Sequence, residues 1–153
     1  MKPAHLVALR NLVLLYRWQG KLDQAQQALE NAIAAEPSDP EFHFALGMLM
    51  AAQEKFEAAR QELEQTLQLR PNDTIALNNL GVVYLRLGRQ AEALETFERC
   101  AHLAPDYDRP YLNLAMIYQQ TGQNQKARTA LQEFLARHPE NTEVQKAVQE
   151  LGR

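Results

Sequence analysis

Five prolines recur along the chain at a constant interval, and this spacing constrains the fold more than any other feature. Pro3, Pro37, Pro71, Pro105 and Pro139 follow one another at steps of 34 residues. A constant period in this range is typical of repeat architectures, in which one supersecondary unit packs only against its neighbours. The period divides most of the sequence into four equal units, which span residues 6–39, 40–73, 74–107 and 108–141.

Other residues keep the same phase, and their chemistry predicts two helices in each unit. Apolar residues recur at steps of three and four between residues 77 and 87, and the same helical period resumes after Gly88. Small residues on the first helix face small residues on the second, so we expect the two backbones to approach closely. The in-phase rows are Leu12, Leu46, Leu80 and Leu114; Gly47, Gly81 and Ala115; and Ala25, Ala59, Ala93 and Ala127.

The turn between the two helices of a unit has its own signature. Gly20, Gly88 and Gly122 are predicted to end the first helices in the left-handed conformation that glycine adopts at least cost. In the second unit Glu54 takes this place, where a non-glycine residue costs about 1 kcal/mol or more. Residues just after the prolines are predicted to cap the next helices; they are Asp39, Asp73, Asp108 and Asn141.

The motif of the third unit resembles the tetratricopeptide repeat. It consists of Leu80-Gly81, Tyr84, Gly88, Ala93, Phe97 and Pro105, and the pattern recurs four times over residues 6–141. The resemblance implies an all-α fold, a right-handed α-α superhelix of four helix-turn-helix repeats.

The two ends of the chain differ in character. Val144, Ala147, Val148 and Leu151 share one helical face, so residues 142–153 are predicted to form a C-terminal capping helix with a polar outer side. Residues 1–5 are interpreted as the remnant of a preceding repeat or a tail, because Pro3 keeps the phase of the other prolines. We therefore expect the chain to be the C-terminal part of a longer repeat protein.

Composition excludes several classes of protein. The net charge of −3 and the pI of about 5.8 disfavour a nucleic-acid partner, and one cysteine cannot form an internal disulfide. The longest apolar stretches fall far short of the roughly twenty residues that span a bilayer, so membrane insertion is not expected. No export signal is visible near Met1, which makes a cytoplasmic location the default expectation.

The sequence also lacks the groups that catalysis and metal binding require. It has one serine, Ser38, and one cysteine, Cys100, which is expected to be a small buried side chain. His5, His43, His102 and His138 show no ligand spacing, and His43 is expected to serve packing. We predict no catalytic residues, no metal site and no cofactor, and hence a protein that is not an enzyme.

The resemblance implies that the first helix of each repeat lines a concave groove. Over residues 6–19, 40–53, 74–87 and 108–121, four arginines stand against Glu41 and Asp108, a net charge of +2 within an acidic chain. The peptide-binding groove is predicted to consist of Arg10, Asn11, Leu14, Arg17, Phe44, Met48, Asn78, Asn79, Val82, Leu85, Arg86, Arg109, Asn113 and Met116.

Two rows in this groove have alternative interpretations. The asparagines can pair with the backbone of a bound peptide, since an amide offers a donor and an acceptor, or they can bond neighbouring helices. The apolar row of Leu14, Met48, Val82 and Met116 can form the floor of the groove or pack between first helices.

The favoured function is a non-catalytic protein–protein interaction module or scaffold. Its partner is expected to be a protein or peptide with apolar and acidic character. Two alternatives remain: a substrate-recruiting arm of a larger enzyme such as a glycosyltransferase, and self-association through the N-terminal edge.

Overall fold

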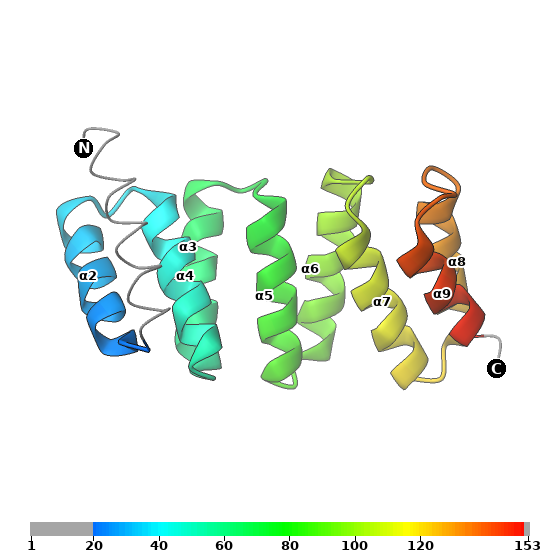
Figure 1. Ribbon diagram of the computed structural model, residues 1–153, viewed down its shortest axis with the longest axis horizontal. Helices are drawn as coiled ribbons and strands as arrows, with labels where there is room; N and C mark the ends of the chain where they lie inside the picture. Colours follow the sequence, from blue (N-terminus) through cyan, green and yellow to red (C-terminus); the bar gives the residue numbers. More distant parts are fainter. Residues whose placement is uncertain (1–19, 152–153) are drawn as a thin grey trace. The chain divides into compact units, whose positions relative to one another are not determined.

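The computed structural model describes residues 20–151, and every regular element within them is an α-helix. In the numbering of Figure 1 the helices are α2 (Leu22–Ala35), α3 (Pro40–Ala52), α4 (Phe56–Leu69), α5 (Thr74–Arg86), α6 (Gln90–Leu103), α7 (Asp108–Gln120), α8 (Asn124–Leu135) and α9 (Thr142–Glu150). Consecutive helices are joined by short turns, and α2, α3 and α4, and likewise α6, α7 and α8, alternate in direction in Figure 1. This is the all-α architecture of helix-turn-helix repeats that the proline spacing predicts.

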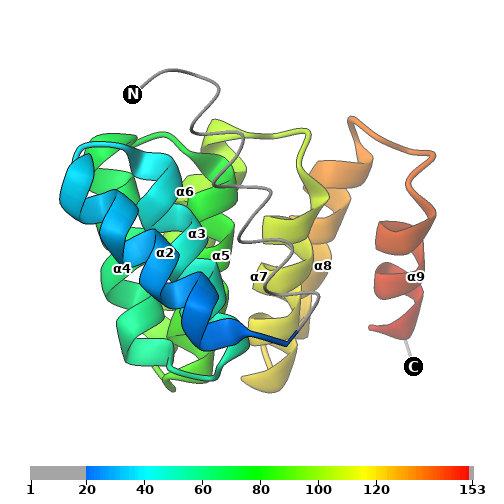
Figure 2. The ribbon, with the colours of Figure 1, turned by 60° about the vertical axis from the view of Figure 1, so that its left-hand side comes forward.

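The chain forms two compact units, which are larger than the 34-residue repeats and divide between Ala76 and Leu77, inside α5. From here on, the first unit and the second unit mean these two parts of the chain. In the first unit α3 packs against both α2 and α4. In the second unit α7 packs against α6 and α8, and α9 contacts α8 and α7 (Figure 2). Sequential neighbours are thus spatial neighbours within each unit, as expected of a repeat protein.

Close helix packing depends on the small residues in the predicted rows. Ala59, Ala93 and Ala127 have no exposed surface. A Cβ atom built on Gly81 would lie 2.6 Å from Cε1 of Phe97, closer than any real Cβ contact, so α5 and α6 meet with no room for a side chain there. At Gly47 the corresponding distance to Cγ of Leu63 is 3.0 Å. The glycines therefore set how near the large residues of the second helix lie to the first.

The turns inside the helix pairs share one hydrogen-bond pattern. The amide of Arg89 donates to the carbonyl of Tyr84 at 2.9 Å, and that of Gly88 donates to Leu85 at 3.0 Å, the two bonds of a Schellman motif. Lys55 and Glu54 donate in the same way to Met50 and Ala51. Glu54 has a φ of 60°, against 73° for Gly88, so the predicted left-handed glutamate is confirmed.

The predicted helix caps are correct in three cases and wrong in one. The side chains of Asp39, Asp73 and Asn141 accept hydrogen bonds from backbone amides at the starts of α3, α5 and α9. Asp108 does not cap α7, because it is the first residue of that helix. Its Oδ2 instead accepts a hydrogen bond from Nδ2 of Asn141 at 3.2 Å, so it connects two helix starts.

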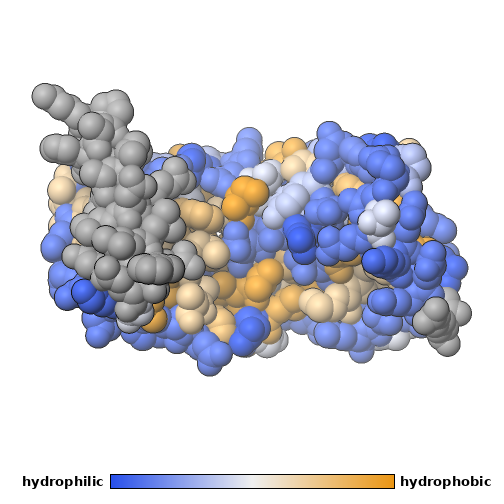
Figure 3. All heavy atoms as spheres, in the orientation of Figure 1, coloured by the Kyte–Doolittle hydropathy of each residue, from blue (hydrophilic) through white to orange (hydrophobic). Residues whose placement is uncertain are grey.

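The last helix has one apolar side, as its sequence predicts. Val144 is fully buried, and Ala147, Val148 and Leu151 pack at the edge of the same core. The surface over α9 is mainly hydrophilic in Figure 3. Within residues 20–151 no helix is both long and apolar enough to cross a membrane. The residue boundaries of the four repeats and of the cap stay predictions.

Replacing Glu54 by glycine should stabilise the protein. The substitution relieves the left-handed strain, partly offset by the greater freedom of glycine in the unfolded chain, and we expect a gain of about 0.5–1 kcal/mol. At this chain length that corresponds to a rise of about 1–4 °C in the melting temperature. Thermal unfolding followed by circular dichroism measures it, with Gly88→Ala as the opposite control. An unchanged or lower melting temperature for Glu54→Gly would contradict the strain.

Gly81→Ala should destabilise the second unit. The new methyl group has to displace the Phe97 ring, and overpacking of this kind costs about 1–3 kcal/mol. Urea unfolding measures the loss, and the double variant Gly81→Ala with Phe97→Leu should lose less than the sum of the two single variants. Additive losses would show that the two residues are not in steric contact.

Candidate functional site

Two large apolar side chains are exposed at equivalent positions of α5 and α7. Val82 is 38% exposed and Met116 is 39% exposed, and they are separated by one repeat length. Apolar surface is visible over α5 and α7 in Figure 3. We call this surface the α5–α7 face and define it by Asn78, Asn79, Val82, Leu85, Arg86, Arg109, Asn113 and Met116.

An amide–amide hydrogen bond joins the two helices of the α5–α7 face. Nδ2 of Asn113 donates to Oδ1 of Asn78 at 3.1 Å. Asn78 is only 9% exposed, whereas Asn79 and Asn113 are half-buried. At Asn113, therefore, the interhelical bond that we considered as the alternative to peptide contact does form.

The arginines of the α5–α7 face lie at opposite ends of it. Arg86 is exposed in the last turn of α5, one helical turn beyond Val82. Arg109 is in the first turn of α7, and its Nη1 donates to Oε1 of Glu143 at 3.3 Å. Glu143 belongs to α9 and was not among the predicted site residues. The signal that could have identified it is its separation of 34 residues from Arg109, which places both at the same repeat position.

The other predicted groove residues lie in the first unit or outside the described residues. Phe44 and Met48 are half-buried on α3, while their neighbours Phe42 and Met50 belong to the core. The predictions for the first helix of the first repeat fall outside residues 20–151; they concern Arg10, Asn11, Leu14 and Arg17.

His43 and Cys100, whose side chains are of types used in catalysis and metal binding, are buried in the core. His43 is buried, with Nδ1 2.8 Å from Oε2 of Glu62 and Nε2 3.0 Å from the carbonyl oxygen of Pro37. Cys100 is fully buried, as expected for a small packing residue. Within the described part of the chain no three histidine, cysteine or carboxylate side chains are grouped to hold a metal ion.

The titratable side chains with perturbed pKa values are held in their ordinary charge states. A hydrogen bond from Arg89 lowers the pKa of Glu92, so this carboxylate remains ionised. Burial, and then a hydrogen bond to Glu98, raise the pKa of Tyr118, so this phenol remains protonated. A general acid or base working near neutral pH would need shifts in the opposite directions.

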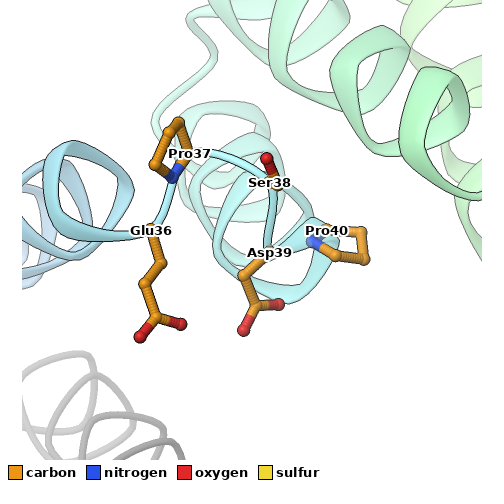
Figure 4. A pocket seen from close by; sticks show the side chains of 5 residues that line it. All are labelled: Glu36, Pro37, Ser38, Asp39 and Pro40. Carbon is orange, nitrogen blue, oxygen red and sulfur yellow. The ribbon is translucent and has the colours of Figure 1, made fainter. Parts of the chain in front are cut away.

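A hollow over the turn between α2 and α3 has a counterpart one repeat further along the chain. It is lined by Glu36, Pro37, Ser38, Asp39 and Pro40, and the two carboxylates point to the same side in Figure 4. A similar hollow lies over Arg70, Pro71, Asn72 and Asp73, one repeat further along the chain. Because it recurs with the repeat and has no grouped ligands, we assign it no function.

Comparison with known proteins places this geometry in a family. One tetratricopeptide repeat profile matches residues 10–73 and 49–108, and a second tetratricopeptide repeat profile matches residues 84–151. No protein with a curated description matches the chain.

Solved structures of similar fold include MamA proteins. A crystal structure of MamA is 21% identical with a TM-score of 0.81, and the match covers 93% of this chain and 83% of that one. MamA from Desulfovibrio magneticus RS-1 is 25% identical, with a TM-score of 0.79 and coverage of 94% and 81%. A tetratricopeptide repeat protein from Parabacteroides merdae is 19% identical, with a TM-score of 0.80 and coverage of 99% and 59%.

The profile matches together extend over most of the described residues, and the helix pairs, the glycine turns and the alanine rows agree with them. The chain belongs to the tetratricopeptide repeat family, whose members generally mediate protein–protein interactions.

Proposed function

We propose that the chain is a non-catalytic binding module that holds a segment of a partner protein on the α5–α7 face. The observation that carries the proposal is the exposure of Val82 and Met116, more than a third of each side chain, at equivalent positions of neighbouring first helices. A contiguous apolar patch rimmed by polar side chains is typical of an interaction site. Methionine adapts to partners of different shape because its side chain is unbranched and polarisable.

The amide pair gives this face a means of recognising a peptide backbone. Asn113 uses its Nδ2 as a donor to Asn78, which leaves Oδ1 of Asn113 and Nδ2 of Asn78 with no partner among residues 20–151. One is an acceptor and the other a donor, the complement of the N–H and C=O of one peptide group. The interhelical bond and a peptide contact are therefore compatible.

The charges indicate the chemistry of the partner. Arg86 and Arg109 lie at the two ends of the α5–α7 face, and arginine binds carboxylates through several N–H donors. A partner segment with aliphatic residues and flanking carboxylates complements this arrangement. Phe44 and Met48 of α3 are proposed as groove residues of the first unit on their repeat positions.

Self-association through the N-terminal edge is a separate hypothesis. It concerns residues outside the described range, and light scattering over a concentration series tests it. A species that remains monomeric at high concentration would exclude it.

A peptide-array screen with charge-inserting variants tests the proposed face. Val82→Glu and Met116→Glu are expected to reduce binding of recovered peptides at least tenfold, because each places a carboxylate in the apolar centre of the face. Gln132→Glu is the matched control, since it adds the same charge on an exposed position of α8.

Melting temperatures of the three variants show whether each one is folded. Because Val82 and Met116 are exposed, these substitutions should change stability by less than about 1 kcal/mol. If the recovered peptides bind all three variants as tightly as the unmodified protein, the α5–α7 face is not the binding surface.

A further inference from the structure

The ion pair between Arg109 and Glu143 joins two positions of the same repeat phase. Glu143 follows Arg109 by 34 residues, so the start of α9 lies where the first helix of a further repeat would begin. In this position Glu143 supplies a carboxylate to the arginine at one end of the α5–α7 face.

Several contacts hold the start of α9 beside the start of α7. Asn141 accepts a hydrogen bond from the amide of Val144 at 2.9 Å and donates to Asp108 at 3.2 Å. His138, in the preceding turn, lies 2.9 Å from Asp106 through Nε2, and Val144 is fully buried. The backbone at Glu143 is therefore positioned by contacts that do not involve its own carboxylate.

The ion pair itself is open to solvent. The side chains of Arg109 and Glu143 are 56% and 55% exposed, and the N···O distance of 3.3 Å is longer than that of a tight charged hydrogen bond. Nε and Nη2 of Arg109 have no partner within residues 20–151. An exposed pair of this kind contributes little to stability, so a second carboxylate can displace the first at small cost.

From this arrangement we propose that Glu143 is an intramolecular competitor for the carboxylate of a partner at Arg109. This proposal rests on the proposed function and adds to it a residue that affects which partners bind. With Glu143 in place, a segment with one isolated carboxylate gains little at Arg109, because it has to replace an existing contact. A segment with several carboxylates beside its aliphatic residues gains more, since any one of them can replace Glu143. Glu143 thus lowers the affinity that a partner gains from a carboxylate at Arg109.

Two defined peptides test the competition. The probes are a fluorescein-labelled hexapeptide of alternating leucine and glutamate and the same peptide with glutamine in place of glutamate. Their dissociation constants are measured by fluorescence anisotropy with the unmodified chain, Glu143→Gln, Arg109→Gln and the double variant. Glu95→Gln is the matched control, because it removes one negative charge from an exposed position on α6 of the same unit.

Glu143→Gln is expected to bind the glutamate peptide about two- to fivefold more tightly than the unmodified chain, the factor that an exposed ion pair can supply. Glu143→Gln should bind the glutamine peptide as tightly as the unmodified chain does. Glu95→Gln should bind both peptides as tightly as the unmodified chain does. In the Arg109→Gln background, Glu143→Gln should give no gain in affinity. The double variant and Arg109→Gln should therefore have the same dissociation constant for the glutamate peptide. Salt at about 1 M should also abolish the gain, because the Debye length then falls to about 3 Å.

The proposal is overturned if Glu143→Gln binds the glutamate peptide no better than the unmodified chain, if both peptides gain equally, or if neither peptide binds any variant. These failures are distinct from failure of the proposed function, which is judged by Met116→Glu with peptides recovered from the array. Because the pair is exposed, all variants should melt within about 2 °C of the unmodified chain.

Discussion

The close approach of two helices at a residue without a side chain is the contact on which the rest of the structure depends. In the second unit Gly81 of α5 faces the ring of Phe97 on α6, and a single methyl group at Gly81 would collide with it. On the second helices Ala93 and Ala127 are fully buried, and their small side chains also allow the neighbouring helix to approach closely. Because one side of each first helix is committed to this packing, its other side is left to contact neighbouring first helices or a partner.

Regular backbone features could be predicted from the sequence because they depend on local chemistry and on the period. The left-handed conformation of Glu54 follows from its alignment with Gly88, and the buried alanines follow from their row. Helix starts at Asp39 and Asn141 follow from capping preferences, since these residues can accept a hydrogen bond from a nearby amide.

Side-chain partners between repeats could not be predicted in the same way. Asp108 has the residue type and the position of a cap, yet it binds Asn141 because the start of α9 lies beside it. Asn113 pairs with Asn78 rather than with the in-phase Asn79, and Arg109 pairs with Glu143. Each choice depends on how far one first helix is displaced and rotated against the next, which the 34-residue period does not specify. The candidate site was thus predictable in its residue types and repeat positions, and its internal bonds were not.

Membership of the tetratricopeptide repeat family specifies the scaffold, whereas the partner is specified by side chains on it. On the α5–α7 face these are an apolar centre, the amide pair of Asn78 and Asn113, and the arginines Arg86 and Arg109, and Arg109 contacts Glu143. Specificity arises from a difference in affinities, in which Glu143 lowers the affinity of partners whose carboxylate has to replace it at Arg109.

Partner binding at the α5–α7 face is tested most directly by the response of the methionine methyl groups to a bound partner. Met116 is exposed at the centre of the α5–α7 face, whereas Met50 is buried in the core of the first unit and serves as an internal reference. In a chain labelled with 13C at the methionine methyls, titration with a peptide recovered from the array should move the Met116 resonance and leave that of Met50 in place. Saturable binding that leaves the Met116 resonance unchanged would contradict the assignment of this face.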